Sequence, residues 1–273
     1  MRRRSDSVGL ASRLGGWHAA APSVAEMTDG FDLEATFNDD YLYFYADRLS
    51  DHNSDVEAAV VWDIGGLHDD ARVLDLACGH GRIANRLAAR GARVCGLDAT
   101  PLFLSVARDD AIRRGVSVDY REGDMRSLPW VAEFDVVFSW FTAFGYFDDD
   151  TNKQILGEVL RALVPGGRFV VHLNHRDSLM SRFAPSSVIE RDGNLMIDQN
   201  RFDPYTGRAH TTRTTIRDGR TQQSAFFTRL FSFTELRAWL LEVGFAGVEG
   251  FDGDGAPLTA SSPRLLIRAT KAA

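Results

Sequence analysis

The sequence predicts an α/β fold: a doubly wound, Rossmann-like sheet of seven mostly parallel strands. Short apolar strands alternate with helices of roughly ten residues, which is the pattern of βαβ units. Three runs rich in Thr, Ile, Phe and Arg, without helical period and separated by turn sequences, then interrupt this alternation and are predicted to be strands. A capped helix and a final strand pair follow. We therefore expect a core with an inserted antiparallel β-meander and an aromatic, helical N-terminal segment.

These changes of pattern set the expected boundaries. Residues 1–28 mix Arg, Ser, Gly and Ala without a sustained period, and they are expected to form a flexible tail. Residues 29–68 are expected to form the aromatic and helical cap. The core is assigned to residues 69–180 and 232–273. Residues 181–231 form the antiparallel insertion, which would cover a binding pocket or help pair two subunits, so that a homodimer is one option.

Helix starts are predicted from capping residues, because a side-chain oxygen can accept a hydrogen bond from the first free backbone N–H groups. A hydroxyl followed three residues later by Glu or Gln has the spacing of a capping box, and Thr before Pro is a further start signal. The predicted starts are Ser54 (with Glu57), Thr100 (with Pro101), Thr151 (with Gln154) and Ser232 (with Glu235).

Charge and composition narrow the classes of partner. The chain has 31 basic and 38 acidic residues, a net charge of −7, which would repel a nucleic-acid backbone unless a local patch reversed it. No run of about 18 apolar residues indicates a membrane span. Cys78 and Cys95 lack metal-binding spacing and fit a reducing compartment. We expect a cytoplasmic protein with a small-molecule ligand and no metal, membrane or nucleic-acid partner.

The stretch VLDLACGHGRIA, residues 73–84, contains a glycine loop with the spacing G-x-G-x-x-A from Gly79. That spacing is typical of dinucleotide loops, whose pyrophosphate sits at a helix N-terminus. Asp75, however, lies four residues before Gly79, where an acid would repel a pyrophosphate. The arrangement favours a cationic ligand without phosphate, such as S-adenosylmethionine. A nicotinamide-dependent oxidoreductase is the alternative that the glycines alone would allow.

Five segments resemble, in order, the motifs of class I S-adenosylmethionine-dependent methyltransferases: DLACGHG, GLD, EGDM, FDVVFSW and LVPGGRFVV. More loosely, the aromatic N-terminal segment, GDMRSL and FTAFGYF resemble bacterial small-molecule methyltransferases, including sugar N,N-dimethyltransferases and natural-product enzymes. The resemblance implies an enzyme that uses S-adenosylmethionine to methylate an N, O or C atom of a small molecule in secondary metabolism. A protein of this fold that binds the cofactor without transferring methyl is a second alternative.

The resemblance also implies which residues surround the methionyl part of the cofactor. Asp75 would hold the amino group, directly or through water. The backbone at Ala77, Gly79 and Gly81 would wrap the cofactor, although the family usually has glycine where Ala77 stands. Ser139, at the end of the fourth predicted strand, would place its carbonyl near the methionyl part.

The remaining cofactor contacts follow from two later motifs. Asp98, at the end of the second predicted strand, would accept hydrogen bonds from both ribose hydroxyls, as an acid does in nucleoside sites of this topology. Asp124 would accept from the adenine amino group, and Met125 would cover the ring. As an alternative, Met125 would simply pack in the core.

Methyl transfer is an in-line displacement, so proximity and exclusion of water can supply most of the acceleration. His175 follows the fifth predicted strand, and it is predicted to be a general base or an acceptor-orienting group because histidine titrates near neutral pH. Aromatic faces suit a sulfonium and a dry site, although the same residues could pack the N-terminal segment. The predicted acceptor-binding residues are Tyr41, Tyr43, Tyr45, Trp140, Phe144, Tyr146 and Asn174.

Overall fold

A computed structural model of the chain describes residues 32–273, and the predicted tail of residues 1–28 lies outside them. Its main sheet has seven strands in the order β10-β11-β5-β4-β1-β2-β3, of which β11 runs antiparallel to β5 and to β10. The strands are β1 (Arg72–Leu76), β2 (Arg93–Asp98), β3 (Asp119–Glu122), β4 (Phe134–Ser139), β5 (Leu163–Asn174), β10 (Phe245–Phe251) and β11 (Arg264–Lys271). The predicted fold class is confirmed.

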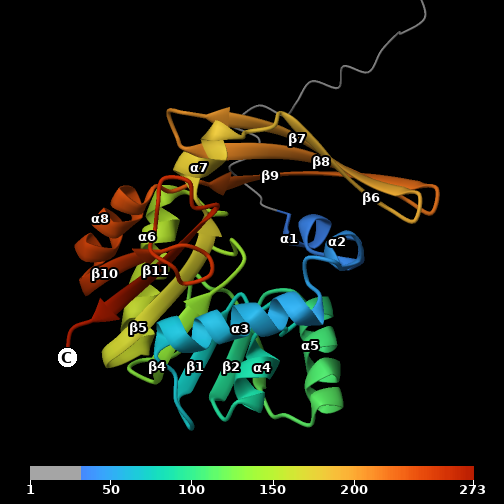
Figure 1. The fold of residues 1–273 in the computed structure, drawn as a ribbon. Coiled ribbons are helices and arrows are strands. Elements are labelled where there is room, and N and C mark those ends of the chain that lie inside the picture. Colours follow the sequence, from blue (N-terminus) through green and yellow to red (C-terminus); the bar gives the residue numbers. More distant parts are fainter. Residues whose placement is uncertain (1–31) are drawn as a thin grey trace, which may run out of the picture.

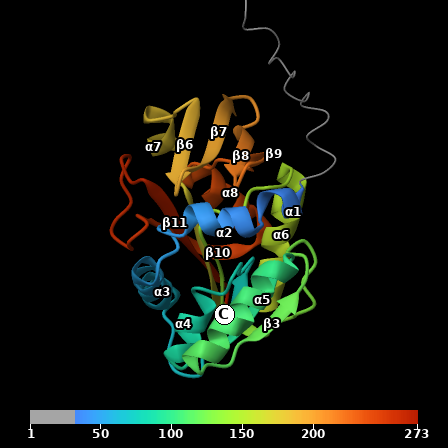
Figure 2. The ribbon, with the colours of Figure 1, turned by 90° about the vertical axis from the view of Figure 1, so that its right-hand side faces the viewer.

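Helices cover both faces of this sheet (Figures 1 and 2). One face packs against α3 (Asp51–Gly65), α4 (Ala84–Ala89) and α5 (Pro101–Arg114), which bury apolar residues such as Val61, Leu87 and Leu104. The other face packs against α6 (Asp149–Ala162) and α8 (Phe233–Val243) through Ile155 and Leu236 among others. The strands can be apolar throughout because both faces are buried.

The strand order reverses at β1, which pairs with β2 on one side and with β4 on the other. In open α/β sheets, the chain leaves the carboxyl ends of two such strands in opposite directions, and a crevice opens between them. The segments that follow β1 and β4 are therefore where a ligand site is expected from the topology alone.

A second sheet lies above this crevice (Figure 1). It has four antiparallel strands in sequential order: β6 (Ser186–Arg191), β7 (Asn194–Asp203), β8 (Arg208–Arg217) and β9 (Arg220–Arg229). The sequence pattern indicated three strands, and it missed the alternation of β6 because most of that strand is exposed. The short helix α7 (Arg176–Ser181) leads into the sheet, while α1 (Leu33–Thr36) contacts β9 and α2 (Asp39–Tyr45) contacts β6.

Two predicted helix starts are wrong by a few residues. Helix α3 begins at Asp51, where the Ser50 hydroxyl accepts from the Asn53 amide, and Ser54 lies buried in its first turn. Helix α6 is capped by Asp148, whose carboxylate accepts from the Thr151 amide at 2.8 Å. In both cases another capping residue stood three or four positions earlier, and spacing alone does not choose between two candidates.

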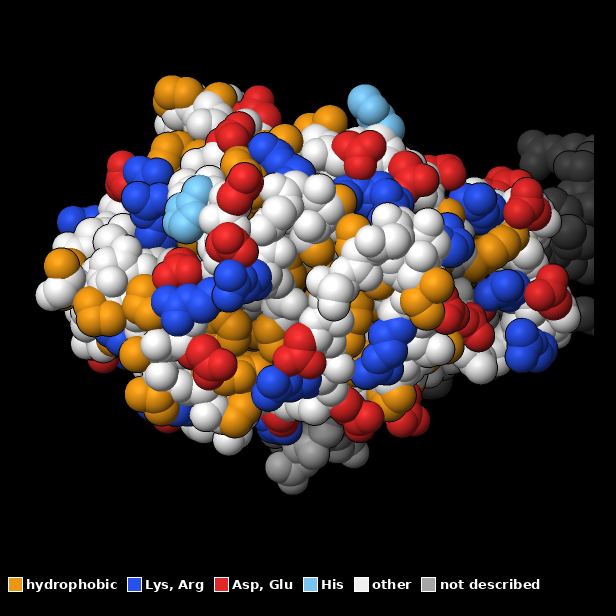
Figure 3. Space-filling model, turned by 90° about the horizontal axis from the view of Figure 1, so that it is seen from below, with side chains coloured by type: hydrophobic (Ala, Val, Ile, Leu, Met, Phe, Trp, Pro, Cys, Tyr) orange, Lys and Arg blue, Asp and Glu red, His pale blue; other side chains and the backbone are white. Residues whose placement is uncertain are grey.

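The other two predicted starts hold. Thr100 precedes α5 and Pro101 opens it, although the Thr100 side chain makes no capping hydrogen bond. Ser232 caps α8 by accepting from the Glu235 amide at 3.3 Å. Over residues 32–273, none of the helices has the length and apolar character needed to span a membrane. The face shown in Figure 3 intersperses acidic and basic side chains.

Candidate cofactor and acceptor site

A cavity of about 1210 Å³ lies between the carboxyl ends of the parallel strands and the second sheet. Its wall includes α1 and α2, the loops after β1, β2 and β3, the segment after β4, the region from α7 to β9, and the start of β11. Pockets for one small ligand are usually about 300–1,000 Å³. The cavity therefore has room for two ligands side by side.

The end of the cavity next to β1 and β2 contains most of the predicted cofactor contacts. The lining residues there include Asp75, Ala77, Gly79, Asp98, Asp124 and Met125. They come from three separate motifs, and the parallel strand order brings them to one edge of the sheet. Their assignments to parts of the cofactor stay predictions.

Asp75 is a buried acid, with only 3% of its surface exposed. Burial raises its pKa well above the usual range, and the neighbouring charge of Asp98 adds to the rise, while Arg82 opposes it. Arg82 itself forms an ion pair with Glu57 at 2.5 Å, so its positive charge is already partly neutralised. A cationic ligand group at Asp75 would favour the ionised carboxylate, which fits the amino group of S-adenosylmethionine.

The loop after β1 contains two residues with positive φ that line the cavity, Ala77 and Gly79. Gly79 has φ +55°, and a β-carbon there would meet nothing closer than Phe103 at 3.8 Å. Ala77 adopts φ +59°, a left-handed conformation that costs a residue with a side chain roughly 1–2 kcal/mol. This explains why glycine is the usual residue of the family at that position, and why alanine is tolerated at some cost.

Asp98 and Asp124 offer acceptors along the same wall. Asp98 accepts the Gly79 amide at 2.7 Å and the Thr100 amide at 2.8 Å, and burial raises the pKa of its carboxyl. Asp124 is held by the Arg126 guanidinium at 2.8 Å, which lowers the pKa of Asp124. Each carboxylate oxygen has a second lone pair, so both groups can still accept from a ligand hydroxyl or amino group.

Two predicted cofactor residues do not line the cavity. At Gly81 a β-carbon would lie 2.1 Å from the Tyr120 hydroxyl and 2.7 Å from the Ala107 β-carbon, so this glycine permits close packing of the loop. Ser139 is 1% exposed, and its hydroxyl has no hydrogen-bond partner within residues 32–273. The segment that follows Ser139, beginning at Trp140, lines the cavity instead.

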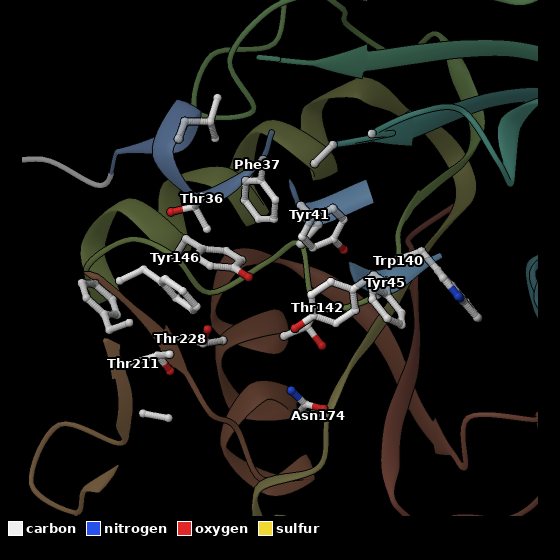
Figure 4. Close-up of a pocket in the computed structure, with 18 of the residues that line it drawn as sticks. Thr36, Phe37, Tyr41, Tyr45, Trp140, Thr142, Tyr146, Asn174, Thr211 and Thr228 are labelled. Carbon is white, nitrogen blue, oxygen red and sulfur yellow. The ribbon is translucent and has the colours of Figure 1, made fainter. Parts of the chain in front are cut away.

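Aromatic side chains form the other end of the cavity (Figure 4). Tyr41 stacks on Tyr45 with ring centroids 4.7 Å apart, and Phe37 lies edge-on to both Tyr41 and Tyr146. Burial raises the pKa of Tyr146 to about 12 and raises the pKa of Tyr41 as well. These phenols are therefore neutral at physiological pH. Trp140 and Asn174 also line this end, as predicted.

Tyr43 and Phe144 are not among the residues that line the cavity, contrary to the sequence prediction. The Tyr43 hydroxyl donates to the Arg191 carbonyl at 2.9 Å, which ties α2 to the second sheet. Because α2 is helical, Tyr43 lies on a different face from Tyr41 and Tyr45, which are four residues apart. Phe144 is 1% exposed and stacks on Phe231 in the core.

His175 does not reach the cavity either. Its ring is 3% exposed, with Nδ1 2.9 Å from the Ser262 carbonyl and Nε2 3.8 Å from the Asp177 carboxylate. The residue immediately precedes α7, and there it packs the core against the loop before β11. This geometry gives His175 a structural role and does not support the predicted role as a base.

Thr142 is a lining residue that sequence reasoning missed. Its φ is +64° and that of the preceding Phe141 is +60°, so two residues with side chains lie consecutively in the left-handed region. Such strain concentrates at functional sites. The Thr142 hydroxyl is buried without a hydrogen-bond partner in the described part of the chain. Figure 4 shows Thr142 among the residues that line the cavity. A β-branched residue gives no sequence signal of a left-handed conformation.

A buried ion pair in the second sheet was also missed. Arg213 donates to the Asp198 carboxylate at 2.7 and 2.8 Å and to the Tyr45 hydroxyl at 3.1 Å. It therefore joins β7 and β8 to α2 across the roof of the cavity. Arg213 lies with Thr211 and Thr215 on the buried face of β8, where an arginine needs a partner, and the sequence alone does not show which face of this strand is buried.

Comparison with known proteins agrees with this arrangement. A family model described as a methyltransferase domain matches residues 73–167. A cypemycin N-terminal methyltransferase from a Streptomyces species is 31% identical over 214 residues, which cover 73% of this chain and 82% of that protein. Fold and site together define a class I S-adenosylmethionine-dependent methyltransferase, and the chain belongs to that family.

Solved structures show the same fold. A methyltransferase from Clostridium acetobutylicum superposes with a TM-score of 0.71 at 17% identity, covering 86% of this chain and 98% of that one. An amino pentose methyltransferase from Micromonospora echinaspora, solved with S-adenosylmethionine bound, superposes with a TM-score of 0.61 at 23% identity, covering 84% and 96%. Other curated relatives match a shorter stretch: the chain spans 46%, 43% and 36% of the length of the first three.

Proposed function

We propose that this enzyme transfers a methyl group from S-adenosylmethionine to a small molecule that binds in the aromatic end of the cavity. The observation that carries the proposal is the continuity of one 1210 Å³ cavity from Asp75 and Asp98 to Tyr41 and Tyr146. The cofactor supplies a methyl group on a sulfonium that is already activated for displacement. The chain would hold the acceptor in line with the methyl group and exclude water, which are the main requirements of such a displacement.

The aromatic end adjoins the cofactor end, since Tyr41 contacts Phe103, which lies beside Gly79, and the residues on both sides of this boundary have defined tasks in the proposal. Phe37, Tyr41 and Tyr45 would exclude water and present aromatic faces to the sulfonium. A change of Thr142 rotamer would turn its hydroxyl, which is buried and lacks a partner within residues 32–273, toward the acceptor nucleophile for a hydrogen bond. Asp75 would hold the amino group of the cofactor and so fix the distance between sulfonium and acceptor.

An amine is the acceptor that fits best, because a neutral amine needs no base at the moment of attack. Burial lowers the pKa of His80 to about 4 and also lowers the pKa of His210, so both of these lining histidines are weak proton acceptors. The similarity to the cypemycin N-terminal methyltransferase and to the amino pentose methyltransferase of calicheamicin biosynthesis supports the same choice and a role in natural-product metabolism. The cytoplasmic location and the homodimer stay predictions from the sequence.

The test is incubation of the full chain with methyl-labelled cofactor and a metabolite extract, followed by identification of the labelled product. A labelled small-molecule amine is the expected result. Label on protein or nucleic acid would contradict the proposed acceptor class. Separately, calorimetry with S-adenosylhomocysteine should show one saturable site per chain, and its absence would contradict the assignment of the cavity.

A further inference from the structure

Arginines outnumber carboxylates along the cavity wall, although the chain as a whole is acidic with a net charge of −7. The lining carboxylates are Asp75, Asp98, Asp124, Asp148 and Asp198. The lining arginines are Arg48, Arg82, Arg126, Arg182, Arg208, Arg213 and Arg264. Such a local reversal of charge indicates either internal ion pairs or an anionic ligand.

Four of these arginines have carboxylate partners. The pairs are Arg82 with Glu57 at 2.5 Å, Arg126 with Asp124 at 2.5 Å, Arg208 with Asp149 at 2.9 Å, and Arg213 with Asp198 at 2.7 Å. Asp98 accepts two backbone amides, and Asp148 caps α6. Every lining carboxylate other than Asp75 therefore already has a hydrogen-bond or ion-pair partner, and Asp75 is assigned to the cofactor site.

Three arginines remain: Arg48, Arg182 and Arg264. Within residues 32–273, none of them has a carboxylate oxygen within 4.0 Å. They come from separate elements, namely the connection between α2 and α3, the end of α7, and the start of β11. Arg264 donates to the Asn174 side chain at 2.6 Å, and Arg182 donates to the Pro263 carbonyl at 3.3 Å. We call these three residues the arginine cluster.

The members of the arginine cluster line one cavity, and Arg264 is repelled by the other two. The pKa of Arg264 is lowered by burial and by the positive charges of Arg48 and Arg182. The carboxylate that raises the pKa of Arg264 is Glu57. It already binds Arg82 and accepts a hydrogen bond from the Trp140 indole at 2.9 Å. Like charges held together without a shared acid are costly unless a ligand neutralises them.

Burial differs across the cluster in a way that suits an entering anion. Arg48 and Arg182 are exposed at the rim, where they remain hydrated and can attract a charged ligand. Arg264 is half-buried, and its guanidinium carbon lies 5.5 Å from the centre of the Phe141 ring. A partly desolvated guanidinium with a fixed plane binds carboxylate or phosphate with two parallel hydrogen bonds.

We propose that the arginine cluster binds an anionic group of the methyl acceptor, a carboxylate or a phosphate. The identification of the ligand as the acceptor rests on the proposed function, whereas the anion site itself does not. The acceptor would then span the cavity, with its anionic group at Arg264 and its nucleophile at Thr142. Asn174, which holds Arg264 and lines the same wall, would set the orientation of the guanidinium.

The test is a calorimetric titration of the full chain with inorganic phosphate and, in a second arm, with succinate, at low ionic strength and saturating S-adenosylhomocysteine. One site per chain is expected for at least one anion, with a dissociation constant below about 10 mM. Arg264→Gln should weaken that binding about tenfold, and Arg48→Gln, which changes an exposed residue, should weaken it about threefold. Tighter phosphate binding assigns a phosphorylated acceptor, and tighter succinate binding assigns a carboxylate.

Arg220→Gln is the matched control, because Arg220 is exposed on β9 outside the cavity and carries the same charge. Its binding of either anion should equal that of the unmodified chain. The proposal is overturned if neither anion binds, or if Arg220→Gln weakens binding as much as Arg264→Gln does. Failure to bind S-adenosylhomocysteine would contradict the proposed function alone, because the anion titrations can be repeated without it.

Discussion

Gly79 donates its backbone N–H to Oδ2 of Asp98, 2.7 Å away and nineteen positions further along the chain. The bond joins the glycine loop after β1 to the end of β2. The other carboxylate oxygen of Asp98 accepts the Thr100 amide at 2.8 Å, at the start of α5. One side chain thus fixes the loop and the helix on either side of the cofactor end of the cavity before any ligand binds.

Asp98→Ala should weaken S-adenosylhomocysteine binding by about a hundredfold, measured by calorimetry. The change removes the predicted ribose acceptor and frees the Gly79 amide from its partner, and hydrogen bonds to a charged group are worth about 1.5–3 kcal/mol each. Asp109→Ala, which removes an exposed acid from α5, is the control and should bind normally. Equal affinities in the two variants would remove Asp98 from the cofactor site.

Asp75→Asn should stabilise the chain without cofactor while weakening cofactor binding. The pKa of Asp75 is raised in the folded state, mainly by burial, so its contribution to stability is fully present below the unfolded pKa and is lost as pH rises through the folded pKa. At pH 7 the neutral amide avoids this loss. We expect Tm to rise by about 2 °C or more at pH 7, with a smaller difference near pH 4.

The same variant should bind S-adenosylhomocysteine at least tenfold more weakly, because the amide offers no charge to the amino group. Thermal unfolding and calorimetry on one preparation measure both effects. A variant that is less stable than the parent chain at pH 7 would show that Asp75 is already satisfied without a ligand.

Gly81→Ala should destabilise the fold by about 3 kcal/mol or more, measured by urea unfolding. A β-carbon would lie 2.1 Å from the Tyr120 hydroxyl, and φ is +74°. Gly115→Ala separates the two causes, because Gly115 has φ +66° with nothing within 4 Å of the added carbon. That control should cost only about 1 kcal/mol. Similar losses in both variants would mean that the loop moves to accommodate the methyl group.

Thr142→Val should reduce methylation of the labelled acceptor about tenfold, with cofactor affinity unchanged. The valine keeps the shape but loses the hydroxyl, and a hydrogen bond of this kind is worth about 1 kcal/mol or more. Because that hydroxyl is buried without a partner in the described chain, Tm should stay the same or rise. Thr142→Ser retains the hydroxyl and should keep most of the activity. Normal turnover in Thr142→Val would exclude Thr142 from acceptor binding.

The cofactor end of the cavity was predictable because its chemistry depends on short motifs tied to strand ends. Asp75, Asp98 and Asp124 each follow from one strand, and the parallel order then brings them together. The acceptor end depends on which face a side chain occupies. Tyr41 and Tyr45 share a face and Tyr43 does not, because residues 39–45 are helical, a distinction that an aromatic run cannot reveal.

His175 shows the second limit. Its position after β5 was predicted. The direction of its ring, however, depends on the loop before β11, almost ninety residues later, where the Ser262 carbonyl lies 2.9 Å from Nδ1. The same holds for the arginine cluster, whose members come from three distant segments. Contacts that are assembled only by tertiary folding leave no local pattern in the sequence.

The two ends of the second sheet meet at one point of the core. His175 and Phe231 form an isolated parallel bridge, and the Arg176 amide donates to the Phe231 carbonyl at 3.2 Å. The segment from α7 to β9 therefore leaves the main domain at His175 and returns to it at Phe231, and these two points are adjacent. We predict that exchange of this single continuous segment between relatives would change the preferred acceptor, while the cofactor contacts at Asp75, Asp98 and Asp124 lie outside it.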